Sequence, residues 1–336
     1  MGIRFCLPDV LHANDPPEHR SGRREDVRMM VIEEEEVRHK QFLELGSFLH
    51  EGDVLVFNDS RTLPAELKGV TEKGEKIAVR LARRLSDKKW AVIVAEGVAE
   101  SGKTIWFSKS LSAMIEKNAG AYDHLSFSKG GTELLNDIYQ IGEPIRYEYI
   151  HEPWPLETYQ TVYSSAPGSV EMTSAGRAFT WKMLFELEAL GVHLAYLTLH
   201  TGISDLLQEN WSPNPCENWE EYTIPKKTAH TVNKALKEGR RVIAVGTTVV
   251  RALESAFDTE VKSGKGSTNL YIHSQTKLQA VHGLLTGFHE PEASHLDMLS
   301  AFVSKEKLDK AYEIAIQEKY LWHEFGDVNL IVGVSK

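Results

Sequence analysis

The segment of residues 240–257 combines residue types that could bind an anion. A short apolar strand is followed by a tight turn, whose residues are Gly246, Thr247 and Thr248. Arg251 then lies in the first turn of a predicted helix, where free N–H groups already carry positive partial charge. A carboxylate or phosphate bound above the turn would explain a cation there. An ion pair with Glu254, three residues further on, would explain it equally well.

Four other predicted strand ends also carry polar residues. They are Asn58, Asp59 and Arg61 after one strand, His200 and Thr201 after another, His289, and Asp327. In open α/β sheets, ligands bind at the carboxyl ends of the strands, so these ends would form a polar site if they converge on one cleft. The structural alternatives are an Asn-Asp-Ser turn that bonds its own backbone and a hydrogen-bonded strand-end histidine. No dinucleotide-binding glycine motif, P-loop or hydrolase nucleophile elbow accompanies them.

The composition is that of a soluble globular protein with room for two domains. The chain has 336 residues, of which 42% are hydrophobic and 26% are charged. Its net charge of −10 argues against a general nucleic-acid coat protein, although a local basic face is compatible with it. Cys6 and Cys216 are isolated, so we expect neither a disulfide framework nor a metal site. Without a membrane-spanning segment or a signal-peptide core, we expect a cytoplasmic protein that does not bind membranes.

The pattern of the chain changes at Ala65. Short β-rich segments separated by Gly, Lys and Ser continue to about Pro144, which predicts a small antiparallel barrel or sandwich. Helical and strand patterns alternate before and after this stretch. We therefore predict an α/β (α+β) main domain, discontinuous over residues 1–64 and 146–336, with an inserted β-rich domain at residues 65–145.

Three stretches of the main domain carry local predictions. Residues 33–49 predict an amphipathic helix, and residues 258–268 predict a flexible loop. Residues 147–180 contain aromatic, proline and small residues without periodicity, which predicts a long functional loop. Thr180 is placed to cap the helix that follows, and Gly191 is placed to end it.

Seven segments of the chain resemble, in the same order, the S-adenosylmethionine:tRNA ribosyltransferase-isomerase family of queuosine biosynthesis. They are VLVFNDSRTLPAEL, YQTVYSSAPGSVEMTSAGRAFT, LTLHTG, EEYTIP, VIAVGTTVVRALES, GLLTGFHEPEASHLDMLSAF and FGDVNLI. The resemblance spans almost the whole chain. It implies an α/β main domain with an inserted small antiparallel β-barrel, in agreement with the change of pattern at Ala65.

The resemblance implies an enzyme that uses S-adenosylmethionine as a ribosyl donor. A base removes a proton from the ribose carbon beside the sulfonium, which stabilises the resulting carbanion, and adenine leaves. The amine of a 7-aminomethyl-7-deazaguanine base in tRNA attacks the ribose, and methionine leaves as the epoxide of epoxyqueuosine closes. The implied partners are therefore S-adenosylmethionine, as a co-substrate, and tRNA, with no cofactor or metal.

Matching positions imply roles for individual residues. Three residues could serve as the base: His200, Glu220 and His289. Arg251 and its turn could hold the methionine carboxylate or a substrate phosphate. The ribose or the incoming base could be held by Asn58, Asp59 and Arg61. The further substrate-binding residues that the resemblance implies are Ser174, Gly176, Thr201, Gly246, Thr247, Thr248 and Asp327.

Several motif positions differ from the usual residues of the family. Ala178 and Asn218 stand where His is usual, Arg177 where Leu is usual, Ser204 and Asp205 where Gly and Thr are usual, Glu290 and Glu292 where an apolar and a basic residue are usual, and Glu66 where Arg is usual. Added carboxylates disfavour a phosphate-rich partner, whereas the segments expected to face S-adenosylmethionine are kept better. Two alternatives therefore stay open: a paralogue that uses a small non-tRNA acceptor, and a ligand-binding homologue without catalysis.

Overall fold

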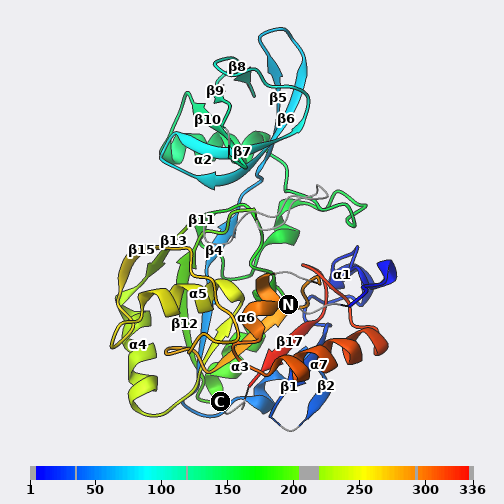
Figure 1. The fold of residues 1–336 in the computed structure, drawn as a ribbon, viewed down its shortest axis with the longest axis vertical. Coiled ribbons are helices and arrows are strands. Elements are labelled where there is room, and N and C mark those ends of the chain that lie inside the picture. Colours follow the sequence, from blue (N-terminus) through cyan, green and yellow to red (C-terminus); the bar gives the residue numbers. More distant parts are fainter. Residues whose placement is uncertain (1–4, 35, 119, 204–218, 292–293, 333–336) are drawn as a thin grey trace.

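The computed structural model describes residues 5–34, 36–118, 120–203, 219–291 and 294–332. A nine-stranded mixed sheet forms the centre of the main body (Figure 1). Its strands in spatial order are β15 (Gly264–Thr268), β13 (Glu220–Ile224), β12 (His193–Leu199), β3 (Val54–Asn58), β14 (Val242–Val245), β16 (Gly283–Gly287), β17 (Val328–Ile331), β1 (Arg28–Ile32) and β2 (Val37–Gln41). The four central strands β12, β3, β14 and β16 run parallel. Strands β3, β14 and β16 are buried along their whole length, as expected for apolar strands covered on both faces.

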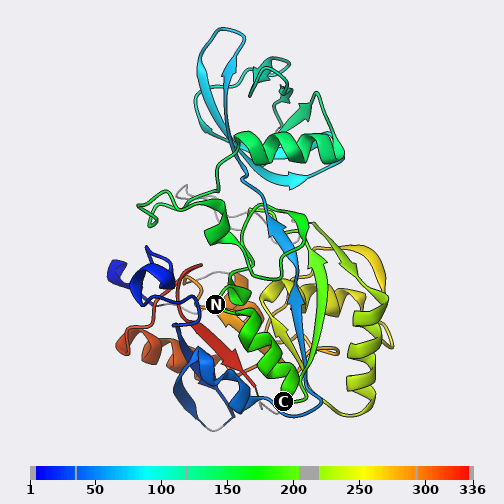
Figure 2. The ribbon, with the colours of Figure 1, turned by 180° about the vertical axis from the view of Figure 1, so that it is seen from behind.

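Helices cover both faces of this sheet (Figures 1 and 2). The helices of the main body are α1 (Pro17–Arg20), α3 (Trp181–Ala189), α4 (Lys226–Lys237), α5 (Thr247–Ala256), α6 (Ser294–Leu299) and α7 (Lys305–Gln317). Val56 on one face of β3 belongs to the core that α4, α5 and α7 cover. Phe57, the next residue, points to the opposite core, which α3 covers. None of the helices in the described part is long and apolar enough to cross a membrane.

The predicted ends of α3 are confirmed by the structure. The Thr180 hydroxyl accepts a hydrogen bond from the Met183 amide at 3.3 Å, which caps the first turn. Gly191 follows the helix with a φ of +82°, in the left-handed region that favours glycine.

The inserted unit is a closed antiparallel barrel that stands above the main body (Figures 1 and 2). Its strands are β5 (Glu66–Thr71), β6 (Lys76–Arg84), β7 (Lys89–Glu96), β8 (Thr104–Trp106), β9 (Ser112–Glu116) and β10 (Asp123–Phe127). Helix α2 (Gly131–Ile141) adds Leu134 and Ile138 to the barrel core, which contains Leu81, Trp90 and Leu125. The predicted fold class is thereby confirmed, and the boundaries 65 and 145 stay a prediction.

Short elements connect the barrel and the sheet. Strand β4 (Ser60–Thr62) pairs in parallel with β11 (Ala166–Ser169). The 3-10 helices are η1 (Asp9–Leu11), η2 (Phe42–Phe48), η3 (Leu156–Tyr159) and η4 (Ser174–Gly176). The predicted long loop of residues 147–180 thus contains only η3, β11 and η4 within the described residues.

Two local predictions were wrong. Residues 33–49 do not form an amphipathic helix, because Val37–Gln41 pairs with β1 as an edge strand. The 3-10 helix Phe42–Phe48 follows it, and its buried Phe42, Leu45 and Phe48 are spaced by three residues, which fits three residues per turn. The predicted loop of residues 258–268 contains β15, an edge strand of Gly, Lys, Ser and Thr that pairs with β13. Such a strand lacks an apolar alternation that could have revealed it.

Candidate active site

A cavity of about 490 Å³ lies at the carboxyl end of the main sheet. The turns that follow β12, β14 and β16 border it, and so does the first residue of the antiparallel strand β13. Eight of the fourteen predicted site residues line it: Ser174, Thr201, Glu220, Gly246, Thr247, Thr248, Arg251 and His289. The predicted convergence of strand ends on one cleft is therefore observed for three strands of the sheet.

An ion pair between Arg251 and Glu220 lies in this cavity. The side chains are 18% and 3% exposed, so the pair is largely removed from water. The predicted alternative, a pair with Glu254, is wrong: the Glu254 carboxylate instead accepts hydrogen bonds from the backbone amides of residues 279–281. The anion that Arg251 faces is thus the Glu220 carboxylate, which lies 31 residues earlier in the sequence.

The turn before Arg251 brings the amino end of α5 to the cavity. Gly246 has a φ of +96°, which only glycine adopts without strain, and the helix begins directly after it at Thr247. Arg251 is therefore the fifth residue of α5 and lies in its second turn, so the predicted position in the first turn is wrong. The amide groups of the first helical turn have no partner within an α-helix. Thr247 and Thr248 therefore present N–H groups to the cavity side of α5, where an anionic group would be stabilised.

Two stacked imidazoles line the same cavity. The His289 ring lies parallel to the His295 ring, with centroids 4.4 Å apart, and its Nε2 lies 2.9 Å from Thr286 Oγ1. Burial lowers the pKa of His289 well below its usual value, and His295 and His323 lower it further. Burial and the nearby Arg251 lower the pKa of His295 to about 4. Both imidazoles are therefore neutral at pH 7.

A further wall of the cavity was missed by sequence reasoning. The Tyr149 ring stacks on His323 at 4.0 Å, and His323 Nε2 lies 2.7 Å from His12 Nδ1. The Tyr149 hydroxyl donates to Glu324 Oε2 at 2.5 Å, and the Tyr147 hydroxyl donates to Glu171. Burial, together with His12, lowers the pKa of His323 to about 3. The one sequence signal for this wall is the unusual aromatic content of residues 147–180.

Asn58, Asp59 and His200 are predicted site residues that lie behind the cavity rather than in its wall. The Asn58 amide donates to the Leu199 carbonyl at 2.8 Å and to Thr248 Oγ1 at 3.2 Å, and its Oδ1 accepts from the backbone amides of the same Leu199 and of Ser60. Asp59 accepts from the hydroxyls of residues 165 and 198. His200 Nδ1 lies 2.8 Å from Ser60 Oγ. These contacts join β3 to the turns that carry Thr201 and Thr248.

Arg61, Gly176 and Asp327 also lie outside the cavity lining. The Arg61 guanidinium lies 5.9 Å from the ring of Tyr139 in the barrel helix. A Cβ at Gly176 would lie 1.8 Å from the Tyr163 hydroxyl, so close packing requires glycine there. Asp327 accepts from the backbone amides of residues 28 and 321, and burial raises its pKa. A role in substrate binding stays a prediction for these residues and for Asn58 and Asp59, and a role as the base stays a prediction for His200.

Within the described ranges, no three His, Cys, Asp or Glu side chains are grouped so that they could hold a metal ion. The cavity instead offers a buried ion pair, a helix amino end, neutral imidazoles and tyrosine-bound carboxylates. Such a set can bind a zwitterionic ligand and supply acid and base groups to it.

The chain is similar to known proteins of one family. The family model of queuosine biosynthesis proteins matches residues 2–331. The S-adenosylmethionine:tRNA ribosyltransferase-isomerase of Carboxydothermus hydrogenoformans is 36% identical, over 98% of this chain and 98% of the relative. The enzyme of the same name from Thermus thermophilus is also 36% identical, over 92% and 93%. The chain belongs to this family of enzymes.

A solved structure agrees with this membership. The crystal structure of an S-adenosylmethionine tRNA ribosyltransferase from Thermotoga maritima matches the fold with a TM-score of 0.56 and 28% sequence identity. The match covers 98% of this chain and 99% of that chain. The resemblance that the motifs predicted is therefore confirmed, together with the barrel inserted into an α/β main body.

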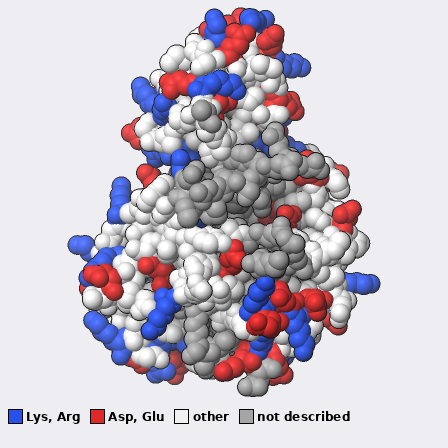
Figure 3. Space-filling model, in the orientation of Figure 1, with Lys and Arg blue, Asp and Glu red and all other residues white. Residues whose placement is uncertain are grey.

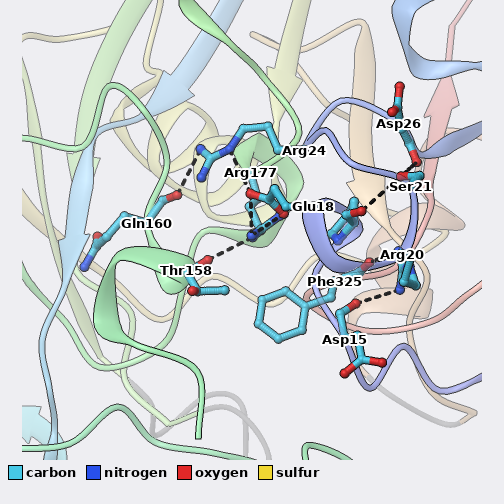
Figure 4. Close-up of polar contacts among 11 residues, drawn as sticks. Asp15, Glu18, Arg20, Ser21, Arg24, Asp26, Thr158, Gln160, Arg177 and Phe325 are labelled. Carbon is cyan, nitrogen blue, oxygen red and sulfur yellow. Dashed lines mark hydrogen bonds and ion pairs between the residues drawn. The ribbon is translucent and has the colours of Figure 1, made fainter. Parts of the chain in front are cut away.

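Arg177, one of the departures from the usual family residues, has a structural role here (Figure 4). Its side chain is 3% exposed, and its Nη2 lies 3.1 and 3.0 Å from the carboxylate oxygens of Glu18. Its Nε also donates to the Thr158 carbonyl at 2.9 Å. Arg177 therefore holds the amino-terminal segment, which carries His12 into the cavity wall.

Three of the other departures lie within the described residues, and the rest lie outside them. Glu66 forms an ion pair with Arg80 in the barrel, and Glu290 lines the cavity 3.7 Å from His323. The buried Ala178 belongs to the core beside α3. The remaining departures, Ser204, Asp205, Asn218 and Glu292, lie outside the described residues.

Proposed function

We propose that this chain transfers and isomerises the ribosyl group of S-adenosylmethionine onto a 7-aminomethyl-7-deazaguanine base in tRNA. The products are epoxyqueuosine-tRNA, adenine and methionine, and S-adenosylmethionine acts as a co-substrate without a further cofactor. The observation that carries the proposal is the convergence of eight predicted residues on one cavity in a chain that matches the family over residues 2–331.

The ion pair and the amino end of α5 suit the methionine part of the donor. A zwitterionic amino acid needs a partner for its carboxylate and a partner for its ammonium group. The amides of Thr247 and Thr248 and the cation of Arg251 favour the carboxylate. The Glu220 carboxylate favours the ammonium and the sulfonium. Because the pair is largely buried, these interactions are screened less by water than at the surface.

Glu220 and His289 are the two predicted bases that line the cavity. The base takes one proton from the ribose carbon beside the sulfonium, and the electron pair left on that carbon drives the loss of adenine. The acceptor amine then bonds to the ribose, and methionine leaves with the electrons of its carbon–sulfur bond as the epoxide closes. The lowered pKa keeps His289 in the neutral form that a base requires.

Mass analysis of the reaction tests the proposal. The protein is incubated with S-adenosylmethionine and tRNA that carries 7-aminomethyl-7-deazaguanine, and the digested nucleosides are followed together with adenine and methionine. We expect release of both small products in step with the epoxyqueuosine nucleoside, and no release with tRNA that carries guanine instead. Glu220→Gln and His289→Asn are compared with Phe185→Ala, a substitution at a 63% exposed position on α3. At saturating S-adenosylmethionine, the variant that loses adenine release identifies the base.

Two outcomes would contradict the proposal. Turnover with the free 7-aminomethyl-7-deazaguanine base, and none with the tRNA, would assign the chain to a small acceptor. Binding of S-adenosylmethionine in calorimetry without any product would assign it to a ligand-binding homologue.

A further inference from the structure

One face of the barrel exposes apolar side chains between lysines. Trp106 of β8 and Val70 of β5 are directly paired across two strands, and Lys76 of β6 is paired with Val70 from the other side. Val70 is 42% exposed and Trp106 is 49% exposed. With Lys68 and Lys109 they border a hollow of about 680 Å³, which Glu96 also lines. We call Lys68, Val70, Lys76, Trp106 and Lys109 the Trp106 face.

The charge of the barrel differs from that of the main body. Residues 65–145 contain 12 Lys and Arg against 11 Asp and Glu, whereas the remaining residues contain 26 against 37. Figure 3 shows Lys and Arg side chains interspersed with Asp and Glu side chains over the barrel. A polyanion is therefore repelled by the main body as a whole and is tolerated by the barrel, where lysines can displace its counterions.

The barrel also stands where a large substrate would leave the cavity. The chain enters the barrel past Thr62 and returns to the main body past Pro144 and Ile145, and all three residues line the cavity. Both crossings therefore lie in its wall, so the barrel adjoins the cavity. A tRNA that places one base in the cavity must extend beyond it, because a cavity of about 490 Å³ holds only a small part of a nucleic acid.

We propose that the Trp106 face binds the tRNA substrate outside the cavity. Trp106 and Val70 pack against a base or ribose, and Lys68, Lys76 and Lys109 contact phosphates. Aromatic side chains beside cationic ones form the sequence-tolerant surfaces on which single-stranded nucleic acids stack. The Lys68 ion pair with Glu143, at 2.8 Å, is exposed on both sides and so is weak enough to yield to a phosphate. This inference rests on the proposed function.

Binding measurements on the full-length protein test the Trp106 face. Affinity for the precursor tRNA is measured over a series of salt concentrations for Trp106→Ala, Trp106→Phe and the double variant Lys76→Ala with Lys109→Ala. Phe185→Ala and Lys182→Ala, both on the exposed side of α3, are the matched controls. We expect Trp106→Ala to weaken tRNA binding about tenfold and Trp106→Phe to retain most of the affinity. The double lysine variant should lower the salt slope by about 1 to 2.

The controls should bind tRNA as the wild type does, and all variants should keep S-adenosylmethionine affinity and turnover at saturating tRNA. If the wild type modifies tRNA and the Trp106 face variants bind it equally well, the inference is wrong and the proposed function stands. If the wild type neither binds nor modifies the precursor tRNA, both fail together. A loss of self-association in Trp106→Ala with unchanged tRNA affinity would make this face a contact between copies, which also contradicts the inference.

Discussion

The cavity and the barrel are built in opposite ways. The residues that line the cavity come from segments spread along the chain from His12 to Glu324. The shape of the cavity therefore depends on how the main body folds. The barrel is one continuous stretch whose antiparallel strands pair mostly with near neighbours in the sequence. The barrel surface can therefore change without moving the cavity, whereas a change in the main sheet reaches the cavity directly.

The largest expected effect follows removal of the cavity ion pair. Arg251→Met leaves Glu220 buried without its partner, which should lower the free energy of unfolding by about 3–5 kcal/mol. The double variant Glu220→Gln with Arg251→Met should recover part of the lost free energy of unfolding. It should still release no adenine. Urea unfolding and product release measure the two effects separately. Unchanged stability in Arg251→Met alone would show that the pair is not buried as described.

A core substitution in the barrel sharpens the contrast between the two regions. Leu81→Ala removes a fully buried side chain and should lower the stability of the barrel by about 2–5 kcal/mol. Hydrogen exchange should then accelerate in the barrel strands, while S-adenosylmethionine affinity stays at the wild-type value. A parallel loss of donor affinity would mean that the barrel core supports the cavity through Val170, which belongs to the same apolar cluster as Leu81 and lines the cavity.

The cavity imidazoles predict a loss of stability in acid. Unfolded His295 has a pKa near 6.5 and the folded residue has a pKa of about 4, so the unfolded state binds more protons between these values. Acidification therefore favours unfolding. His295→Gln should reduce the loss in unfolding free energy between pH 7 and pH 5 by about 2 kcal/mol. A pH dependence equal to that of the wild type would contradict the lowered pKa.

The smallest expected effect concerns the amino-terminal segment. Arg177→Leu removes the contacts to Glu18 and to the Thr158 carbonyl. Because Glu18 is partly exposed and can be hydrated again, we expect a loss of only about 1 kcal/mol. Limited proteolysis should cut the segment before residue 27 faster than in the wild type. Equal cleavage rates would show that other contacts hold the segment.

The parts of the fold that depend on local patterns could be predicted from the sequence. The apolar strand, the Gly246 turn and the helix with Arg251 follow one another, so each supports the assignment of the next. The turn spacing after Ala65 predicted a small antiparallel barrel or sandwich, and the structure has a closed barrel there. Strand β15 could not be predicted, because its pairing with β13, rather than its own residues, makes it a strand.

The candidate site was only partly predictable, because a polar residue at a strand end can either face a ligand cavity or hydrogen-bond to the protein itself. Asn58 lies at the end of one buried strand, and Thr248 lies just after the end of another. Only Thr248 lines the cavity, whereas the Asn58 side chain donates hydrogen bonds to the Leu199 carbonyl and to the Thr248 hydroxyl. The partner of Arg251 and the position of His12 depend on tertiary contacts between distant segments. A single sequence does not show such contacts.

A crystal structure with S-adenosylmethionine bound tests the central claim most directly. We expect the ligand in the cavity, with its carboxylate at the amides of Thr247 and Thr248 and its ribose within reach of Glu220 or His289. Donor density beside His200, in the adjoining hollow that Arg83 and Arg84 line, would contradict the account, because Thr247, Thr248 and His289 do not line that hollow.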